Sequence, residues 1–277
     1  MTERQPVPPN LVDDAEAYLT GDRSPVEPKP ASTVVLIRDG EHGIDVYLLR
    51  RHAGMAFAAG MYAFPGGRVD PRDDDAEIGW GGPAAADWAA RLGCSEPAAR
   101  ALVCAAVRET FEESGVLLAG PGPDDIVGDT RGPDWEADRA ALVDRSLPFT
   151  TFIARRGLVL RTDLLGYWAH WITPEFEPRR YDTRFFVARM PSGQLTRDVS
   201  GEADRADWMA TADALGGIED GSMAMLPPTS MTIRQVATHR RVADVLQAAR
   251  HRAVNTVRPG VALLDGQPVF TDIDDMD

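Results

Sequence analysis

Three glutamates lie close together in the segment A-A-V-R-E-T-F-E-E-S-G, which spans residues 105–115. Glu109, Glu112 and Glu113 are three and four residues apart, so on a helix their carboxylates project from one face. Carboxylates held so close repel one another, and a hard divalent cation such as Mg²⁺ or Mn²⁺, which prefers oxygen ligands, relieves that repulsion. The spacing therefore predicts a helix whose acidic face binds metal ions, with Arg108 beside the carboxylates to orient them.

The same helix carries an apolar face opposite to the acidic one. Val103, Val107 and Phe111 recur every four residues and are suited to packing against a sheet. Upstream, an apolar stretch runs into F-P-G-G at residues 64–67, whose glycines allow a tight turn and a close approach of the backbone to a ligand. We therefore expect a helix with one face in the core and the other in the site, preceded by a strand and a glycine turn.

Together these two blocks resemble the Nudix box, the motif of the Nudix hydrolases. Its pattern is a glycine, five residues, a glutamate, seven residues and then R-E-U-x-E-E-x-G-U, where U is a bulky apolar residue. The second half matches from Arg108 to Val116, with Phe111 in the first apolar position. The resemblance implies an α/β fold, namely a Nudix-type α/β/α sandwich with a mixed sheet and extra helices.

The first half of the box does not keep its spacing. Residues 68–107, forty in all, separate Gly67 from Arg108 where the pattern has thirteen, so 27 residues are in excess. We place the insert at about residues 71–97. Within it, Pro83 to Leu92 predicts a short helix that ends at a glycine.

The insert leaves two features of the box to be assigned. Ser95 is the expected N-cap of the acidic helix, with Glu96 in its first turn. The first glutamate of the box has no firm counterpart, because counting forward from Gly67 reaches Asp73 and counting back from Arg108 reaches an arginine. Asp73 and Glu96 both remain open as its replacement.

An insert at this place is similar to the Nudix subgroup related to peroxisomal coenzyme A diphosphatases, whose box is interrupted. The segment L-L-R-R at 48–51, followed by Met55, Phe57 and Gly60, resembles the coenzyme A signature ahead of the box. Further motifs extend the resemblance to about residues 31–250: W-I-T-P at 171–174, R-R-Y-D-T-R-F-F at 179–186 and L-P-P-T at 226–229. The resemblance implies a metal-dependent hydrolase of a diphosphate P–O–P linkage, with coenzyme A or acyl-coenzyme A as the leading substrate.

The resemblance also implies a set of site residues. Glu109, Glu112 and Glu113 would hold Mg²⁺ or Mn²⁺ together with the carbonyl of Gly67 and would activate a bound water. A glutamate outside the box often completes such a site, and Glu202 is the candidate; Glu112, Glu113 and Glu202 all remain open as the general base. The expected substrate contacts are Arg50, Arg51, Phe64, Gly66 and Gly67.

Three functions remain open from the sequence. The first is hydrolysis of coenzyme A or its acyl derivatives, which requires residues 48–60 to line the pocket beside the acidic helix. The second keeps the reaction but changes the substrate to another nucleotide, such as NADH, ADP-ribose or a dinucleoside polyphosphate. The third is a binding module that has lost catalysis; the interrupted box supports it, whereas the intact set of carboxylates argues against it.

Composition narrows the class of protein. The chain has 277 residues, of which 44% are hydrophobic and 26% charged, as expected for a globular protein with a large core. Its formal charge of −14 disfavours a nucleic acid polymer as partner and is compatible with a small phosphorylated nucleotide only if a cation changes the local potential. No apolar run has the length of a membrane span and the N-terminus lacks a secretory signal, so we expect a cytoplasmic protein.

Turn signals and periodicity divide the chain into an extended, proline-rich arm at 1–30, a Nudix domain at 31–254 with the insert, and a tail at 255–277. The expected strands are 32–38, 44–50, 166–173, 181–188 and 203–208, and the expected helices are 11–19, 149–156, 211–215 and 231–254. A homodimer through the arm or the last helix is open.

Other polar residues receive structural interpretations. His170 lies between two tryptophans on an expected strand and is interpreted as packed rather than catalytic. Arg179, Arg180 and Arg184 lie near Asp182, which favours ion pairing at a strand over a phosphate site. The two cysteines are too few for a disulfide framework, and Cys104 is expected to be buried.

Overall fold

The computed structural model describes residues 6–52, 54, 59–74, 77–197 and 203–271. In these residues the helices are α1 (Val12–Leu19), α2 (Ala85–Leu92), α3 (Glu96–Ser114), α4 (Pro133–Val143), α5 (Phe149–Arg155), α6 (Thr211–Glu219), α7 (Pro227–Ala237) and α8 (Val242–His251). The strands are β1 (Lys29–Gly40), β2 (Gly43–Arg51), β3 (Tyr62–Ala63), β4 (Gly66–Arg68), β5 (Trp80–Gly81), β6 (Ala119–Gly120), β7 (Val159–Arg161), β8 (Leu165–Ile172), β9 (Tyr181–Arg189), β10 (Ala203–Ala210), β11 (Thr256–Val257), β12 (Gly260–Leu264) and β13 (Gln267–Thr271).

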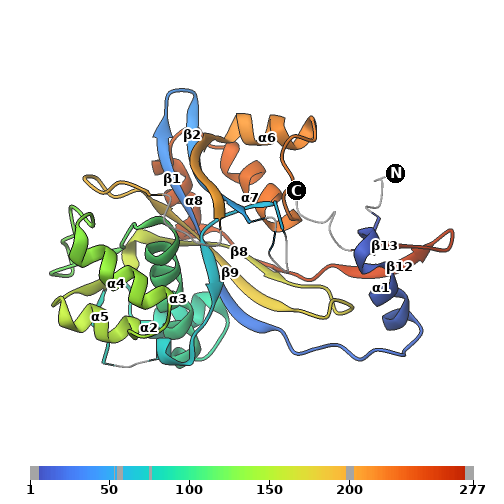
Figure 1. Ribbon diagram of the computed structural model, residues 1–277, viewed down its shortest axis with the longest axis horizontal. Coiled ribbons are helices and arrows are strands. Elements are labelled where there is room, and N and C mark those ends of the chain that lie inside the picture. The colour runs from blue at the N-terminus through green and yellow to red at the C-terminus, as the bar shows by residue number, and fades with distance from the viewer. Residues whose placement is uncertain (1–5, 53, 55–58, 75–76, 198–202, 272–277) are drawn as a thin grey trace.

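A mixed sheet forms the centre of the molecule, with strands in the order β10-β2-β1-β9-β8-β11. Strands β1 and β9 are parallel, whereas β1 with β2 and β8 with β9 are antiparallel. Side chains alternate across it: Val34 and Leu36 enter one apolar cluster, and Val35 and Ile37 enter the other. Helices α2, α3 and α5 cover the first face and α6, α7 and α8 the second (Figure 1). The expected α/β/α sandwich with a mixed sheet is confirmed.

The F-P-G-G turn lies in a fork of this sheet. Strand β1 pairs with β2 from Ile37 to Gly40, and then with β4 from Ala31 to Thr33. Strand β2 meanwhile pairs with β3, and the amide of Val34 donates to the carbonyl of Pro65 at 2.8 Å. The turn therefore bridges two strands that have separated, and backbone pairing on both sides fixes its position.

The insert adds a helix and a strand next to α3. As predicted, a short helix, α2, ends at a glycine, and the positive φ of 65° at Gly93 allows that ending. Trp88 of α2 is fully buried and meets Phe186 of β9 edge to face at 5.8 Å. Ser95 caps α3, since its hydroxyl accepts from the amide of Ala98 at 3.4 Å. The insert is thus part of the core on the α3 side of the sheet.

The single helix expected at 231–254 is wrong, because the structure has two helices there, α7 and α8. The chain breaks between them, and the amide of Val242 at the start of α8 donates to the Asp39 carboxylate at 2.8 Å. Asp39 lies near the end of β1, where it pairs with Ile44 of β2, so a residue far away in sequence satisfies the free amide at the start of a new helix.

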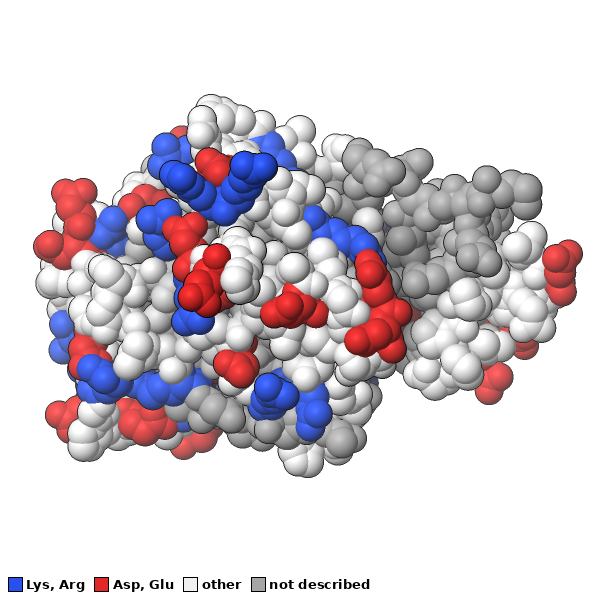
Figure 2. Space-filling view, turned by 90° about the horizontal axis from the view of Figure 1, so that it is seen from above, with Lys and Arg blue, Asp and Glu red and all other residues white. Residues whose placement is uncertain are grey.

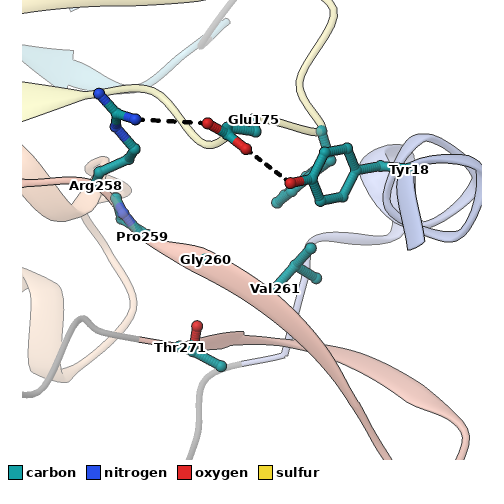
Figure 3. A pocket seen from close by; sticks show the side chains of 8 residues that line it. Tyr18, Glu175, Arg258, Pro259, Gly260, Val261 and Thr271 are labelled. Carbon is teal, nitrogen blue, oxygen red and sulfur yellow. Dashed lines mark hydrogen bonds and ion pairs between the residues drawn. The ribbon is translucent and has the colours of Figure 1, made fainter. Parts of the chain in front are cut away.

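The two ends of the described chain pack on each other away from the box. Helix α1 and the β12–β13 hairpin share a small apolar cluster, and the amide of Val7 donates to the carbonyl of Pro268 at 3.0 Å. Glu175 joins them to the sheet: it accepts from the Tyr18 hydroxyl at 2.7 Å and pairs with Arg258 at 3.5 Å, beside a cavity of about 250 Å³ (Figure 3).

The surface mixes the two signs of charge despite the formal charge of −14. On the face seen in Figure 2, acidic and basic side chains lie next to one another rather than in separate fields. Within the part of the chain that the structure describes, no helix combines the length and the apolar character needed to span a membrane.

Replacing Asp39 should weaken the start of α8. We expect Asp39→Ala to lower the free energy of unfolding by about 1 kcal/mol, because it removes the side-chain acceptor for the first turn. Asp39→Asn should cost less, since its amide oxygen also accepts. Glu41→Ala, an exposed change in the turn that follows β1, is the control. Urea unfolding measures all three, and equal stability of the Asp39 and Glu41 alanine variants would contradict the capping role.

Candidate active site

The guanidinium of Arg108 is the centre of the polar contacts on α3. Its Nη1 donates to Glu109 at 2.8 Å and to Glu112 at 3.2 Å. Its Nε and Nη2 donate to the two carboxylate oxygens of Asp73 at 3.1 and 3.0 Å, and Nη2 also donates to the carbonyl of Arg68 at 2.9 Å. The Arg108 side chain is only 10% exposed. One buried cation thus contacts three carboxylates.

Asp73 takes the position in the site that the sequence left open. It lies six residues after Gly67, in a 3-10 turn (Pro71–Asp74), and is 1% exposed. Besides pairing with Arg108, it accepts from the amide of Asp70 at 2.8 Å. Glu96, the other candidate, is exposed and instead lies 3.8 Å from Arg100. The extra residues therefore enter the chain after the Asp73 pair, and the contact between the two halves of the box is kept.

The two glycines of the turn lie directly against α3. The amide of Gly66 donates to the carboxylate of Glu113 at 2.9 Å. A Cβ at Gly67 would come within 2.4 Å of the Glu109 carboxylate, and one at Gly66 would come within 2.5 Å of the Thr33 hydroxyl. Only residues without a side chain allow this turn to contact the acidic face.

Burial makes the carboxylates of α3 hard to ionise. Burial raises the pKa of Glu109 from 4.5 to about 7, and although Arg108 opposes this rise, Glu112 adds to it. Burial likewise raises the pKa of Glu112, again against Arg108. For Arg108 itself burial disfavours the charged form, but Glu109 and Asp73 outweigh it and raise its pKa. The fully ionised site would carry more negative charge than one arginine offsets.

A divalent cation suits this donor set, which consists of carboxylates with an excess of negative charge. Within the described residues, however, no three or more His, Cys, Asp or Glu side chains are gathered closely enough to hold an ion. Instead, Glu109 and Glu112 accept hydrogen bonds from the guanidinium of Arg108, while Glu113 accepts one from the amide of Gly66. Glu202, the predicted ligand outside the box, lies outside the described residues.

The predicted substrate contacts fall in two places. Arg50 and Arg51 are at the end of β2, opposite Tyr62 of β3 and Ala203 of β10 respectively, next to the fork that holds the glycine turn. Phe64 is 4% exposed and belongs to the apolar cluster on the other face of the sheet. The prediction that Phe64 contacts substrate therefore conflicts with its position, because its side chain fills the core.

Arg139 is a site residue that sequence reasoning missed. It is 7% exposed in α4 and donates from Nη1 to the backbone carbonyl of Glu112 at 2.8 Å. It thereby fixes the last turn of α3 against α4. Its neighbour Glu136 shows an ordinary ion pair at i, i+3, and nothing in that local pattern predicts a contact 27 residues back along the chain.

Three structural interpretations from the sequence are confirmed: a packed His170, ion pairing at Asp182 for Arg184, and a buried Cys104. His170 is 7% exposed; its Nε2 lies 2.5 Å from Asp182 and its Nδ1 lies 2.7 Å from the Thr256 hydroxyl. Arg184 forms an ion pair with Asp182. Cys104 is fully buried in the core.

Comparison with known proteins decides the family. A model of the NUDT19 Nudix domain matches residues 82–236, more than half of the chain. The chain belongs to this Nudix family. It is also similar to a crystal structure of a NUDIX hydrolase from Alicyclobacillus acidocaldarius, with a TM-score of 0.69 and 28% identity over 80% of this chain and 96% of that one.

Two curated relatives are more distant in sequence. One is the acyl-coenzyme A diphosphatase NUDT19 of Gallus gallus, 24% identical over 253 residues, covering 76% of this chain and 65% of that protein. The other is the putative nudix hydrolase 7 of Caenorhabditis elegans, 27% identical over 183 residues, covering 66% of this chain and 52% of that protein. This Nudix chain therefore spans between half and two thirds of the length of these relatives.

Removing the charge of Asp73 should destabilise the fold. We expect Asp73→Asn to lower the free energy of unfolding by roughly 3 kcal/mol, because it leaves the buried guanidinium of Arg108 without its bidentate partner. Asp74→Asn changes an exposed neighbour in the same turn and should have little effect. Urea unfolding of both variants tests this, and similar midpoints would show that the Asp73 pair contributes nothing.

The stability of the metal-free protein should depend on pH through Glu109. Its pKa of about 7 in the folded state exceeds the ordinary value of 4.5, so between these values the folded state binds more protons and loses stability as pH rises. Glu109→Gln cannot ionise and escapes that loss. In EDTA, the melting temperature of Glu109→Gln relative to the unaltered protein should therefore rise from pH 5 to pH 8. A difference that stays constant or falls would be evidence against a buried, hard-to-ionise Glu109.

Proposed function

We propose that this Nudix chain is a metal-dependent diphosphatase that cleaves the P–O–P linkage of a nucleoside diphosphate derivative, with coenzyme A or acyl-coenzyme A as its substrate. The arrangement of Arg108 with Glu109 and Glu112, and of Glu113 with the glycine turn, is the observation that carries the proposal. Membership of the NUDT19 Nudix family and likeness to a protein named acyl-coenzyme A diphosphatase support the substrate.

Each residue has a distinct part in this proposal. Glu109, Glu112 and Glu113 would hold Mg²⁺ or Mn²⁺ together with the Gly67 carbonyl, and Arg108 with Asp73 would keep the glutamates in place. When bound, such an ion offsets the charge of the phosphates and lowers the pKa of a coordinated water. Glu112, Glu113 and Glu202 are the candidate bases that accept a proton from that water.

Carboxylates and backbone from two segments meet at the proposed site. Two half-buried carboxylates, Glu112 and Glu113, lie at the end of α3, and the amide of Gly66 in the glycine turn donates to Glu113. Arg50 and Arg51 lie beside the same fork and are proposed to contact the phosphates or the 3′-phosphate of coenzyme A. A cytoplasmic location, a homodimer and the division into arm, domain and tail stay predictions.

A substrate panel tests the reaction. The protein is incubated with Mg²⁺ or Mn²⁺ and coenzyme A, acetyl-coenzyme A, NADH, ADP-ribose or diadenosine tetraphosphate, and the released monophosphates are identified. Release of adenosine 3′,5′-bisphosphate from coenzyme A supports the proposal. Preference for another compound keeps the reaction and rejects the substrate, and no hydrolysis of any compound leaves the binding module as the better interpretation.

Glu113→Gln should separate catalysis from folding. We expect it to lower kcat on the preferred substrate by about tenfold to hundredfold, because it removes one carboxylate ligand, while its amide oxygen still accepts from Gly66. Glu96→Gln, at the exposed start of the same helix, is the matched control and should keep full activity. Unchanged turnover in Glu113→Gln with a normal melting temperature would refute the assignment of α3 as the metal site.

A further inference from the structure

Arg145 has a backbone conformation that costs stability. It follows α4 and adopts a φ of +64°, and Asp265 with φ +51° is the other non-glycine residue in the left-handed region among those the structure describes. Asp265 precedes Gly266 in the tight turn of the β12–β13 hairpin, where aspartate is common. Arg145 instead occupies the position after a helix end that glycine normally takes. An arginine there needs a reason other than stability.

A chain of hydrogen bonds joins Arg145 to the carboxylate site. Its backbone carbonyl accepts from Nη1 of Arg72 at 3.1 Å, and the guanidinium of Arg72 is held by both oxygens of Asp70 at 2.9 and 2.8 Å. The amide of Asp70 donates to Asp73, the partner of Arg108. The backbone at Arg145 is thus joined to Arg108 through four successive contacts, by way of Arg72, Asp70 and Asp73.

The side chain of Arg145 is exposed. Within the described residues it forms neither a hydrogen bond nor an ion pair, although the neighbouring Asp144 accepts from the amide of Ser146. Its positive charge nevertheless acts on Glu112, where it is among the influences that oppose the raised pKa of that carboxyl.

We propose that Arg145 forms a phosphate subsite beside the carboxylate site, where its guanidinium binds the substrate phosphate that the glutamates and their cation do not hold. A guanidinium presents paired donors that match phosphate oxygens, and one without a protein partner needs no ion pair broken to bind. The proposal deepens the proposed function, since it assumes a substrate with two linked phosphates, and it assigns one of them to the loop between α4 and α5.

Stability and binding should change in opposite directions when Arg145 becomes glycine. Arg145→Gly relieves the left-handed strain and should raise the melting temperature by about 2–4 °C. The same change should weaken binding of inorganic pyrophosphate in Mg²⁺ by about tenfold, because a charge-assisted contact is lost. Asp265→Gly relieves the comparable strain in the distant hairpin, and it should raise the melting temperature without changing pyrophosphate binding.

Calorimetry with pyrophosphate and thermal unfolding measure both effects, and KM and kcat for coenzyme A complete the test. Arg145→Lys, which keeps the charge, should bind pyrophosphate more tightly than Arg145→Ala. Equal affinity of Arg145→Ala and the unaltered protein, or no pyrophosphate binding by the unaltered protein, would overturn the subsite. Failure of the diphosphatase proposal shows instead as absence of hydrolysis across the substrate panel, which leaves the pyrophosphate comparison to judge Arg145 by itself.

Discussion

A single buried cation holds the site together. Arg108 is withdrawn from water, and a guanidinium in that position is tolerated only because Asp73, Glu109 and Glu112 surround it with charge and hydrogen-bond acceptors. The dependence is mutual, since the carboxylates are themselves buried and repel one another. Each structural piece around the site therefore has to present its polar group to the same guanidinium: the 3-10 turn supplies Asp73, and α3 supplies both glutamates.

The insert leaves the glycine turn undisturbed because the extra residues begin after Asp73. The glycine turn is fixed by β1 on one side and β2 on the other, and the 3-10 turn that follows completes the pair between Asp73 and Arg108. The extra residues begin after that pair and return through α2 and the Ser95 cap. Loop closure costs only about 0.6 kcal/mol for each doubling of loop length, and burial of Trp88 offsets that cost.

The sequence predicts the features of the site that depend on residues close together in the chain. The spacing of the glutamates, the glycines of the turn and the Ser95 cap are short-range patterns, and the helix and turn that they predict are present. Contacts between distant segments were not readable in this way. The Asp39 carboxylate caps the second of two helices in a region whose periodicity resembles one helix. Phe64 lies in the short link between β3 and β4, and its side chain packs in the core. Only three-dimensional contact distinguishes Asp73 from Glu96.

Charge and strain are concentrated in the same small region, and the rest of the fold supports them. The acids of α3 are held in partly buried positions that raise the pKa of Glu109 and Glu112, and Arg145 keeps a backbone that glycine would adopt more easily. The acids keep their positions because α3 is anchored on two sides: its apolar face packs in the core through Val103, Val107 and Phe111, while Arg139 fixes its last turn to α4. A helix so constrained cannot turn its carboxylates away from one another, so their mutual repulsion remains available to be offset by a ligand.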